Sequence, residues 1–108
     1  MSQPYLPETD TRANIDARRG PAVIDFGTNW CGHCQAAQPL VDRAVGAHPG
    51  LVHLKVEDGS GRPLGRSFRV KLWPTLVFLR DGQEVARLVR PSDAASIEEA
   101  LAKLGVAT

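Results

Sequence analysis

The sequence has 108 residues, of which 43% are hydrophobic, and a formal net charge of +1 from 13 Lys and Arg against 12 Asp and Glu. This length supports one hydrophobic core and not two, so we expect a single domain over residues 1–108. The balanced charge gives no reason to expect a nucleic-acid partner, and no apolar run approaches the ~20 residues of a membrane span.

The N-terminal residues and the cysteine content indicate the compartment. Residues 1–8 contain two prolines and lack the basic start and apolar stretch of a secretory signal, so we expect an extended arm or a short edge strand. Two cysteines are too few for a disulfide-stapled secreted scaffold. We therefore expect a cytoplasmic protein.

The first half of the chain alternates helical and strand patterns after this arm. Thr9 or Asp10 is expected to cap a helix that runs to about Arg18. The short apolar run 22–26 predicts a buried strand. Residues 31–45 show helical spacing of apolar side chains, and Pro39 inside this segment should kink the helix.

The second half continues the alternation and ends in a hairpin and a helix. The patterns predict a strand at 51–56, a loop at 58–61, a short helix at 63–68, a strand at 75–79, a tight Asp81-Gly82 turn, a strand at 84–89, and a last helix capped by Ser92 or Asp93 and ending at Gly105. This order predicts an α/β fold with a central mixed sheet of four to five strands and helices on both faces.

Both cysteines lie between the first predicted strand and the long helix, in the string Trp30-Cys31-Gly32-His33-Cys34. At a helix N-terminus, the backbone N–H groups and the dipole stabilise the thiolate of Cys31, which is the reactive form. Cys34 lies one turn further and deeper. This spacing suits a dithiol in which Cys31 attacks a disulfide and Cys34 resolves the mixed disulfide. Gly32 keeps the turn small, and protonated His33 would favour the thiolate and make the disulfide more oxidising.

Other chemistry is open to such a pair. In a zinc site the further ligands would be His33, His48 and His53, but there is no second cysteine pair. Haem attachment requires a histidine directly after the second cysteine, where Gln35 stands. Two buried structural cysteines are the third alternative. The strand–helix junction favours redox chemistry over all three, with no metal and no bound cofactor.

The strand Val23-Ile24-Asp25-Phe26 and the Cys-Gly-His-Cys string resemble the strand and active-site turn of the thioredoxin superfamily. The resemblance covers about residues 10–105. It includes a helix-kink proline, a lysine in the following strand, a cis-proline segment and a hairpin, at Pro39, Lys55, Trp73-Pro74-Thr75 and Asp81-Gly82-Gln83-Glu84. It implies a thioredoxin fold and thiol–disulfide exchange.

The resemblance also implies roles for individual residues. Asp25 is implied to be the buried acid that exchanges a proton with the resolving Cys34, with Lys55 as its neighbour. Burial raises the pKa of a carboxyl group, which suits a proton acceptor; a structural salt bridge to Lys55 is the alternative. Pro74 is implied to be a cis-proline facing the Cys pair, leaving the backbone before it free to pair with a substrate; otherwise it only starts a strand.

Several positions depart from the thioredoxin pattern. His33 replaces a proline, as in protein disulfide isomerases, and Gly27 replaces a flanking tryptophan, which should leave the site more open. Trp73 replaces a small aliphatic residue, and Arg90 replaces a glycine of the substrate groove. Trp30 either shields the thiol and contacts the partner or belongs to the core. The expected substrate-binding residues are Trp30, Trp73, Pro74, Thr75 and Arg90.

We therefore expect a thiol–disulfide oxidoreductase that exchanges its Cys31–Cys34 couple with disulfide-containing or dithiol proteins. It should be more oxidising than a typical thioredoxin, act as a monomer, and receive electrons from a thioredoxin reductase-like donor. The alternative is an adaptor of the same fold whose Cys pair responds to redox state while its task is docking.

Overall fold

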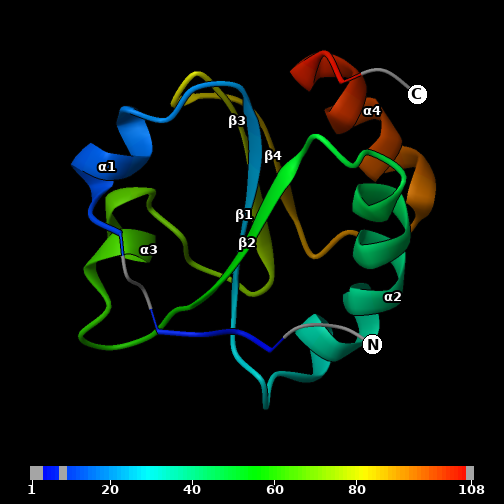
Figure 1. Cartoon of the computed structure of the whole chain (residues 1–108). Coiled ribbons are helices and arrows are strands. Elements are labelled where there is room, and N and C mark those ends of the chain that lie inside the picture. The colour runs from blue at the N-terminus through cyan, green and yellow to red at the C-terminus, as the bar shows by residue number, and fades with distance from the viewer. Residues whose placement is uncertain (1–3, 8–9, 107–108) are drawn as a thin grey trace.

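The computed structural model describes residues 4–7 and 10–106 (Figure 1). The elements follow the predicted order, with bounds α1 Arg12–Asp16, β1 Pro21–Gly27, α2 Gly32–Gly46, β2 Val52–Glu57, α3 Pro63–Ser67, β3 Thr75–Arg80, β4 Gln83–Val89 and α4 Ala94–Leu104. Within the described ranges, no helix is both long and apolar enough to cross a membrane.

The strands form one mixed sheet in the order β2-β1-β3-β4. The neighbouring strands β1 and β2 are parallel, whereas β3 runs antiparallel to both β1 and β4. The described part of the N-terminal arm extends the sheet by an isolated parallel bridge from Leu6 to Val56 on β2. In this bridge the Leu6 N–H donates to the Lys55 carbonyl at 3.2 Å, and the Glu57 N–H donates to the Leu6 carbonyl at 2.8 Å. The four strands are thus as predicted, and among residues 4–7 the structure shows only this single bridge to the sheet.

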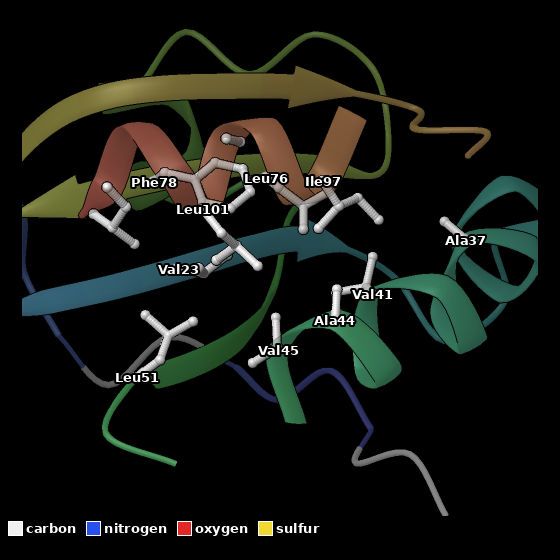
Figure 2. Close-up of a cluster of buried hydrophobic side chains, with 12 residues drawn as sticks. Val23, Ala37, Val41, Ala44, Val45, Leu51, Leu76, Phe78, Ile97 and Leu101 are labelled. Atoms are coloured by element: carbon white, nitrogen blue, oxygen red, sulfur yellow. The ribbon is translucent and has the colours of Figure 1, made fainter. Parts of the chain in front are cut away.

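Helices cover both faces of the sheet, as predicted (Figure 1). Helices α2 and α4 lie on one side, and α1 and α3 lie on the other. The alternation of side chains along each strand creates a separate apolar cluster on each face. The cluster under α2 and α4 includes Val23, Val41, Phe78, Ile97 and Leu101, which point into the space between the sheet and these helices (Figure 2). The opposite cluster includes Ile15, Ile24, Phe26, Val77 and Leu79.

Some predicted element ends were wrong by one or two residues. Thr11, and not Asp10, caps α1, because the Thr11 hydroxyl accepts the Asn14 N–H at 3.1 Å; Thr9 lies outside the described residues. Helix α1 then ends at Asp16 and does not reach Arg18. Asp93 is confirmed as the N-cap of α4, and Gly105, with a φ of 84°, caps the helix after its last residue Leu104. Helix α2 runs through Pro39, and the kink there stays a prediction.

The hairpin between β3 and β4 depends on Gly82. Its φ is +79°, and a Cβ at this position would lie 1.9 Å from the Asp16 carbonyl oxygen. Gly20 has nearly the same φ, +81°, but nothing lies within 4 Å of its Cβ position. Both glycines therefore have a conformational reason to be glycine, but only Gly82 also has a steric one.

We predict that Gly82→Ala lowers the free energy of unfolding by at least ~2 kcal/mol more than Gly20→Ala. Both substitutions place a side chain at positive φ, which costs roughly 1–2 kcal/mol, and only Gly82→Ala adds a backbone clash. Chemical denaturation of the two variants measures the difference. Equal losses would contradict the close approach of α1 to the hairpin.

Candidate active site

The Cys pair lies at the junction of β1 and α2, as predicted. Cys31 caps α2, with an extended backbone, and its Sγ accepts the Cys34 N–H at 3.2 Å. Both thiols are free, and their exposed fractions are 8% for Cys31 and 2% for Cys34. The helix N-terminus therefore directs a hydrogen-bond donor at Cys31, while Cys34 is the deeper thiol.

The environment of Cys34 favours its protonated form. Burial, followed by the neighbouring Cys31, raises the pKa of Cys34 to about 12. The neighbouring Thr28 backbone and Tyr5 hydroxyl oppose this increase in the pKa of Cys34 without cancelling it. To act as a nucleophile at neutral pH, Cys34 must therefore give its proton to a neighbouring base.

Asp25 is the buried acid of this site, and the Tyr5 hydroxyl that it binds borders the same small volume as Cys34 Sγ. It lies in the middle of β1, is 3% exposed, and accepts the Tyr5 hydroxyl at 2.7 Å on Oδ1. Its other oxygen, Oδ2, lies 3.8 Å from His53 Nε2. Among the described residues no ion pair joins Asp25 to Lys55, so the structure does not show the salt bridge considered from the sequence.

Lys55 lies on the same side of the sheet as Asp25, because these two residues are paired across β1 and β2. Its Nζ lies 4.7 Å from the centre of the Tyr5 ring, a cation–π contact, and makes no hydrogen bond. Lys55 is therefore near Asp25, as expected. Its ammonium group contacts the ring of Tyr5 and forms no ion pair with Asp25.

Tyr5 corrects the expectation that Gly27 leaves the site open. A Cβ at Gly27 would lie 2.6 Å from Cys34 Sγ and 2.8 Å from Cζ of Tyr5. The ring of Tyr5, which is 6% exposed, therefore fills the space beside Gly27 and packs with both cysteines. The prediction was wrong because the side chain that closes the site comes from the N-terminal arm.

Asn29 holds this arm against the active-site loop. Its side chain makes a pair of hydrogen bonds with the backbone of Tyr5: Oδ1 accepts the Tyr5 N–H at 2.8 Å, and Nδ2 donates to the Tyr5 carbonyl at 3.1 Å. The Asn29 carbonyl accepts a hydrogen bond from Gln35 on α2 at 3.0 Å. The arm, the loop and the helix are thus directly linked beside the Cys pair.

The cis peptide bond predicted at Pro74 is confirmed between Trp73 and Pro74. Trp73 packs against the cluster of Tyr5 and the two cysteines. Its Nε1 donates to Asp58 Oδ2 at 2.8 Å, which fixes the indole. Thr75 is buried, and its hydroxyl donates to the Leu72 carbonyl at 2.6 Å.

Trp30 is a surface residue and not part of the core, which resolves the two alternatives for its placement. It is 74% exposed. Its ring meets Trp73 edge to face, with 5.6 Å between the ring centroids. The two indoles form an aromatic pair next to the cysteines.

Arg90 follows β4 and closes over the cis-proline segment. Its N–H donates to the Pro74 carbonyl, and its Nε donates to the Trp73 carbonyl, both at 2.9 Å. Its φ is +52°, in the left-handed region that glycine adopts most easily. This backbone explains why the related position is a glycine in the thioredoxin pattern.

Gly32 and His33 form the exposed first turn of α2. His33 lines a hollow of about 260 Å³ together with Leu40, Arg90 and Pro91. On the side of Trp73 lies a second and wider hollow, of about 760 Å³, lined also by Asp58 and by Arg62, Arg66 and Arg69. Within the part of the chain that is described, no three His, Cys, Asp or Glu side chains are grouped to hold a metal ion.

The fold and the site together define a class: an α/β domain with a dithiol at a helix N-terminus, next to a cis-proline. Residues 5–103 match the family model described as thioredoxin, and the chain belongs to the thioredoxin family. The structure of thioredoxin 2 from Pseudomonas aeruginosa, in its reduced form, is similar with a TM-score of 0.86 and 57% identity, covering 97% of this chain and 98% of that one.

Curated relatives are similar over shorter stretches. Thioredoxin of Chlamydia trachomatis is 35% identical over 78% of this chain and 82% of its own length. Thioredoxin H2-1 of rice, Oryza sativa, is 37% identical over 62% of this chain but only 49% of its own length. This chain thus spans about half the length of that plant relative.

Sequence reasoning missed Tyr5, His53 and Asn29 as parts of the site. His53 carried a usable signal, because it precedes Lys55 by two residues on a strand and therefore shares its face. Asn29 stands directly before Trp30, but nothing in the sequence indicates that its side chain clamps the arm. Tyr5 carried no local signal, because its role depends on a contact across 20 residues of chain.

The raised pKa of Cys34 predicts selective alkylation. At pH 8 a thiol with a pKa of about 12 is ionised to roughly one part in 10⁴, against about a quarter for an ordinary cysteine of pKa ~8.5. Cys34 in the reduced, folded protein should therefore react with iodoacetamide on the order of a thousandfold more slowly than a cysteine peptide. Its reactivity should rise as the pH approaches 12.

Mass spectrometry of peptides from briefly treated protein measures this difference. Urea-unfolded protein is the control, in which both cysteines should react at the peptide rate. A folded protein whose Cys34 reacts like the peptide would show that the thiol is not held in its protonated form.

Proposed function

We propose that this chain is a thiol–disulfide oxidoreductase acting on disulfide-containing or dithiol proteins. The observation that carries the proposal is the difference between the two thiols: Cys31 receives a backbone N–H at the start of α2, whereas Cys34 lies behind it with a pKa raised by burial. The attacking cysteine must react as a thiolate, whereas the resolving cysteine stays protonated until the mixed disulfide has formed.

In the reductive direction the reaction has two steps. The Cys31 thiolate attacks one sulfur of a substrate disulfide, forming a mixed disulfide and releasing the other sulfur as a thiolate. Cys34 then loses its proton and attacks Cys31 Sγ, which forms the Cys31–Cys34 disulfide and releases the second substrate sulfur. Asp25, which is buried and binds the Tyr5 hydroxyl that borders Cys34, is the base proposed to receive the proton. The oxidative direction reverses these steps.

Substrate binding is proposed to use the surface around the cis-proline. The exposed Trp30 and the half-buried Trp73 form an aromatic pair there, and Trp73 and Arg90 each line one of the two hollows. Pro74 and Thr75 are buried at the start of β3, so they shape this surface through the backbone. An extended chain next to the target disulfide fits such a surface better than a small molecule.

The direction of the reaction depends on the potential of the couple. His33 lies on the exposed first turn of α2, where its protonated form favours the thiolate state, so we propose a couple more oxidising than a typical thioredoxin. A thioredoxin reductase-like electron donor, a monomeric state and a cytoplasmic location complete the proposal.

Cys31→Ser and Cys34→Ser should separate exchange from mere docking. Wild-type protein with dithiothreitol should reduce insulin, Cys31→Ser should abolish the turnover, and Cys34→Ser should accumulate a covalent complex with insulin. Turbidity and non-reducing electrophoresis measure these outcomes. Wild-type protein without any exchange would favour the adaptor alternative and remove the enzyme proposal.

His33→Pro should lower the reduction potential by tens of millivolts, toward the ~−270 mV of thioredoxin and away from the ~−180 mV of disulfide isomerase. The reason is the loss of a protonatable group that favours the reduced state. Equilibration with glutathione buffers measures the potential. His33→Gln is the matched control, because it removes the charge without adding a proline and should shift the potential in the same direction. An unchanged or higher potential in both variants would contradict the role of His33.

A further inference from the structure

The Tyr5 hydroxyl lies between the two groups that must exchange a proton. It donates to Asp25 Oδ1 at 2.7 Å. The point where a Gly27 Cβ would lie is 2.6 Å from Cys34 Sγ and 2.9 Å from the Tyr5 hydroxyl oxygen, so both atoms border the same small volume. Three heavy atoms within 3 Å of that point leave no room there for a water molecule.

The surroundings hold the hydroxyl in this place. The Tyr5 side chain is almost fully buried, its backbone is bound on both sides by Asn29, and Leu6 pairs with β2. Lys55 lies over the ring at 4.7 Å, and His53 approaches Asp25 only on Oδ2. Oδ1 is therefore left to Tyr5.

We propose that Tyr5 is a further catalytic residue, whose hydroxyl relays the proton between the Cys34 thiol and the Asp25 carboxylate. The inference rests on the proposed function, because the relay serves the resolving step. As Cys34 Sγ attacks Cys31 Sγ, its proton passes to the Tyr5 oxygen, and the Tyr5 proton passes to Asp25 Oδ1. The bond from Cys31 to the substrate breaks, and the substrate leaves as a thiolate. Tyr5 ends as a neutral phenol, and Asp25 carries the proton.

The relay explains two features that the proposed function alone leaves without a role. Gly27 has no side chain, which is what allows the Tyr5 ring and Cys34 Sγ to approach each other. The pKa of the Tyr5 phenol is raised well above its usual range by burial and by Asp25, so the group stays protonated and able to donate. A relay hydroxyl needs both properties: contact with donor and acceptor, and a proton to give.

Tyr5→Phe tests the relay, because it removes the hydroxyl and keeps the ring. The reduced protein is mixed with a chromogenic aromatic disulfide, dithiobis(nitrobenzoate). The attack of Cys31 releases one nitrothiobenzoate, and resolution by Cys34 releases the second, so the two steps appear as separate absorbance phases. We expect Tyr5→Phe to leave the rate of the first phase unchanged and to slow the second phase by at least ~10-fold. This loss is smaller than the ~10²–10⁴-fold that removing a general base costs, because Asp25 remains.

Two further variants distinguish a relay from a structural role. In an Asp25→Asn background, adding Tyr5→Phe should slow the second phase no further, because the relay acts only through Asp25. Asn29→Ala, which frees the backbone of the arm and keeps the hydroxyl, should also slow only the second phase. If Tyr5→Phe shows no cooperative thermal unfolding and is therefore not folded, Asn29→Ala still tests the relay.

The outcomes separate this inference from the proposed function. A second phase that is unchanged in Tyr5→Phe, a loss shared equally by both phases, or effects of Tyr5→Phe and Asp25→Asn that multiply would each overturn the relay while exchange itself stands. Wild-type protein that releases no nitrothiobenzoate would instead remove the proposed function, and the relay with it.

Discussion

The buried carboxylate of Asp25 is the constraint on which the active site depends. A carboxylate with 3% exposure in the central strand is costly to keep unless a hydrogen bond replaces the lost water. Tyr5 supplies this bond, which contributes roughly 1.5–3 kcal/mol for a charged acceptor. The Tyr5 ring in turn requires the missing side chain at Gly27 and the clamp by Asn29. The contacts of this one buried acid thus connect the arm, the side-chain-free position at Gly27 and the loop residue Asn29.

The two thiols owe their different environments to backbone geometry more than to their neighbours. They are one helical turn apart, so the first sits at the cap and receives an N–H, and the second contributes that N–H and turns toward the sheet. The sheet face beneath carries Asp25 on β1 and His53 and Lys55 among the polar residues of β2 on that side. The polar cluster and the recessed thiol are therefore brought together by the fold itself.

Much of the fold could be predicted from the sequence because its signals are local. Apolar patterning, helix caps and turn residues located the helices and strands of the described chain to within two residues, and Asp81-Gly82 marked the hairpin. The Cys pair, Asp25 and the cis-Pro74 followed from short motifs and from the resemblance to thioredoxins. The interpretation of Gly27 failed because a missing side chain says nothing about which distant residue fills its place. Tyr5 lies in an arm with no periodicity, and its docking depends on contacts with Asp25, Asn29 and β2, which no local pattern encodes.

The bond from Arg90 to the Trp73 carbonyl changes what recognition at the cis-proline means. In this structure the carbonyls of both Trp73 and Pro74 are already accepting hydrogen bonds from Arg90, one from its side chain and one from its backbone. A partner strand that pairs with the Trp73 carbonyl must replace the guanidinium there. Because Arg90 is exposed, this exchange of donors costs little, and the released cation is then free to pair with an acidic group of the partner. Pairing at this carbonyl would substitute one donor for another, and a partner with negative charge close to the segment that pairs would gain the released guanidinium.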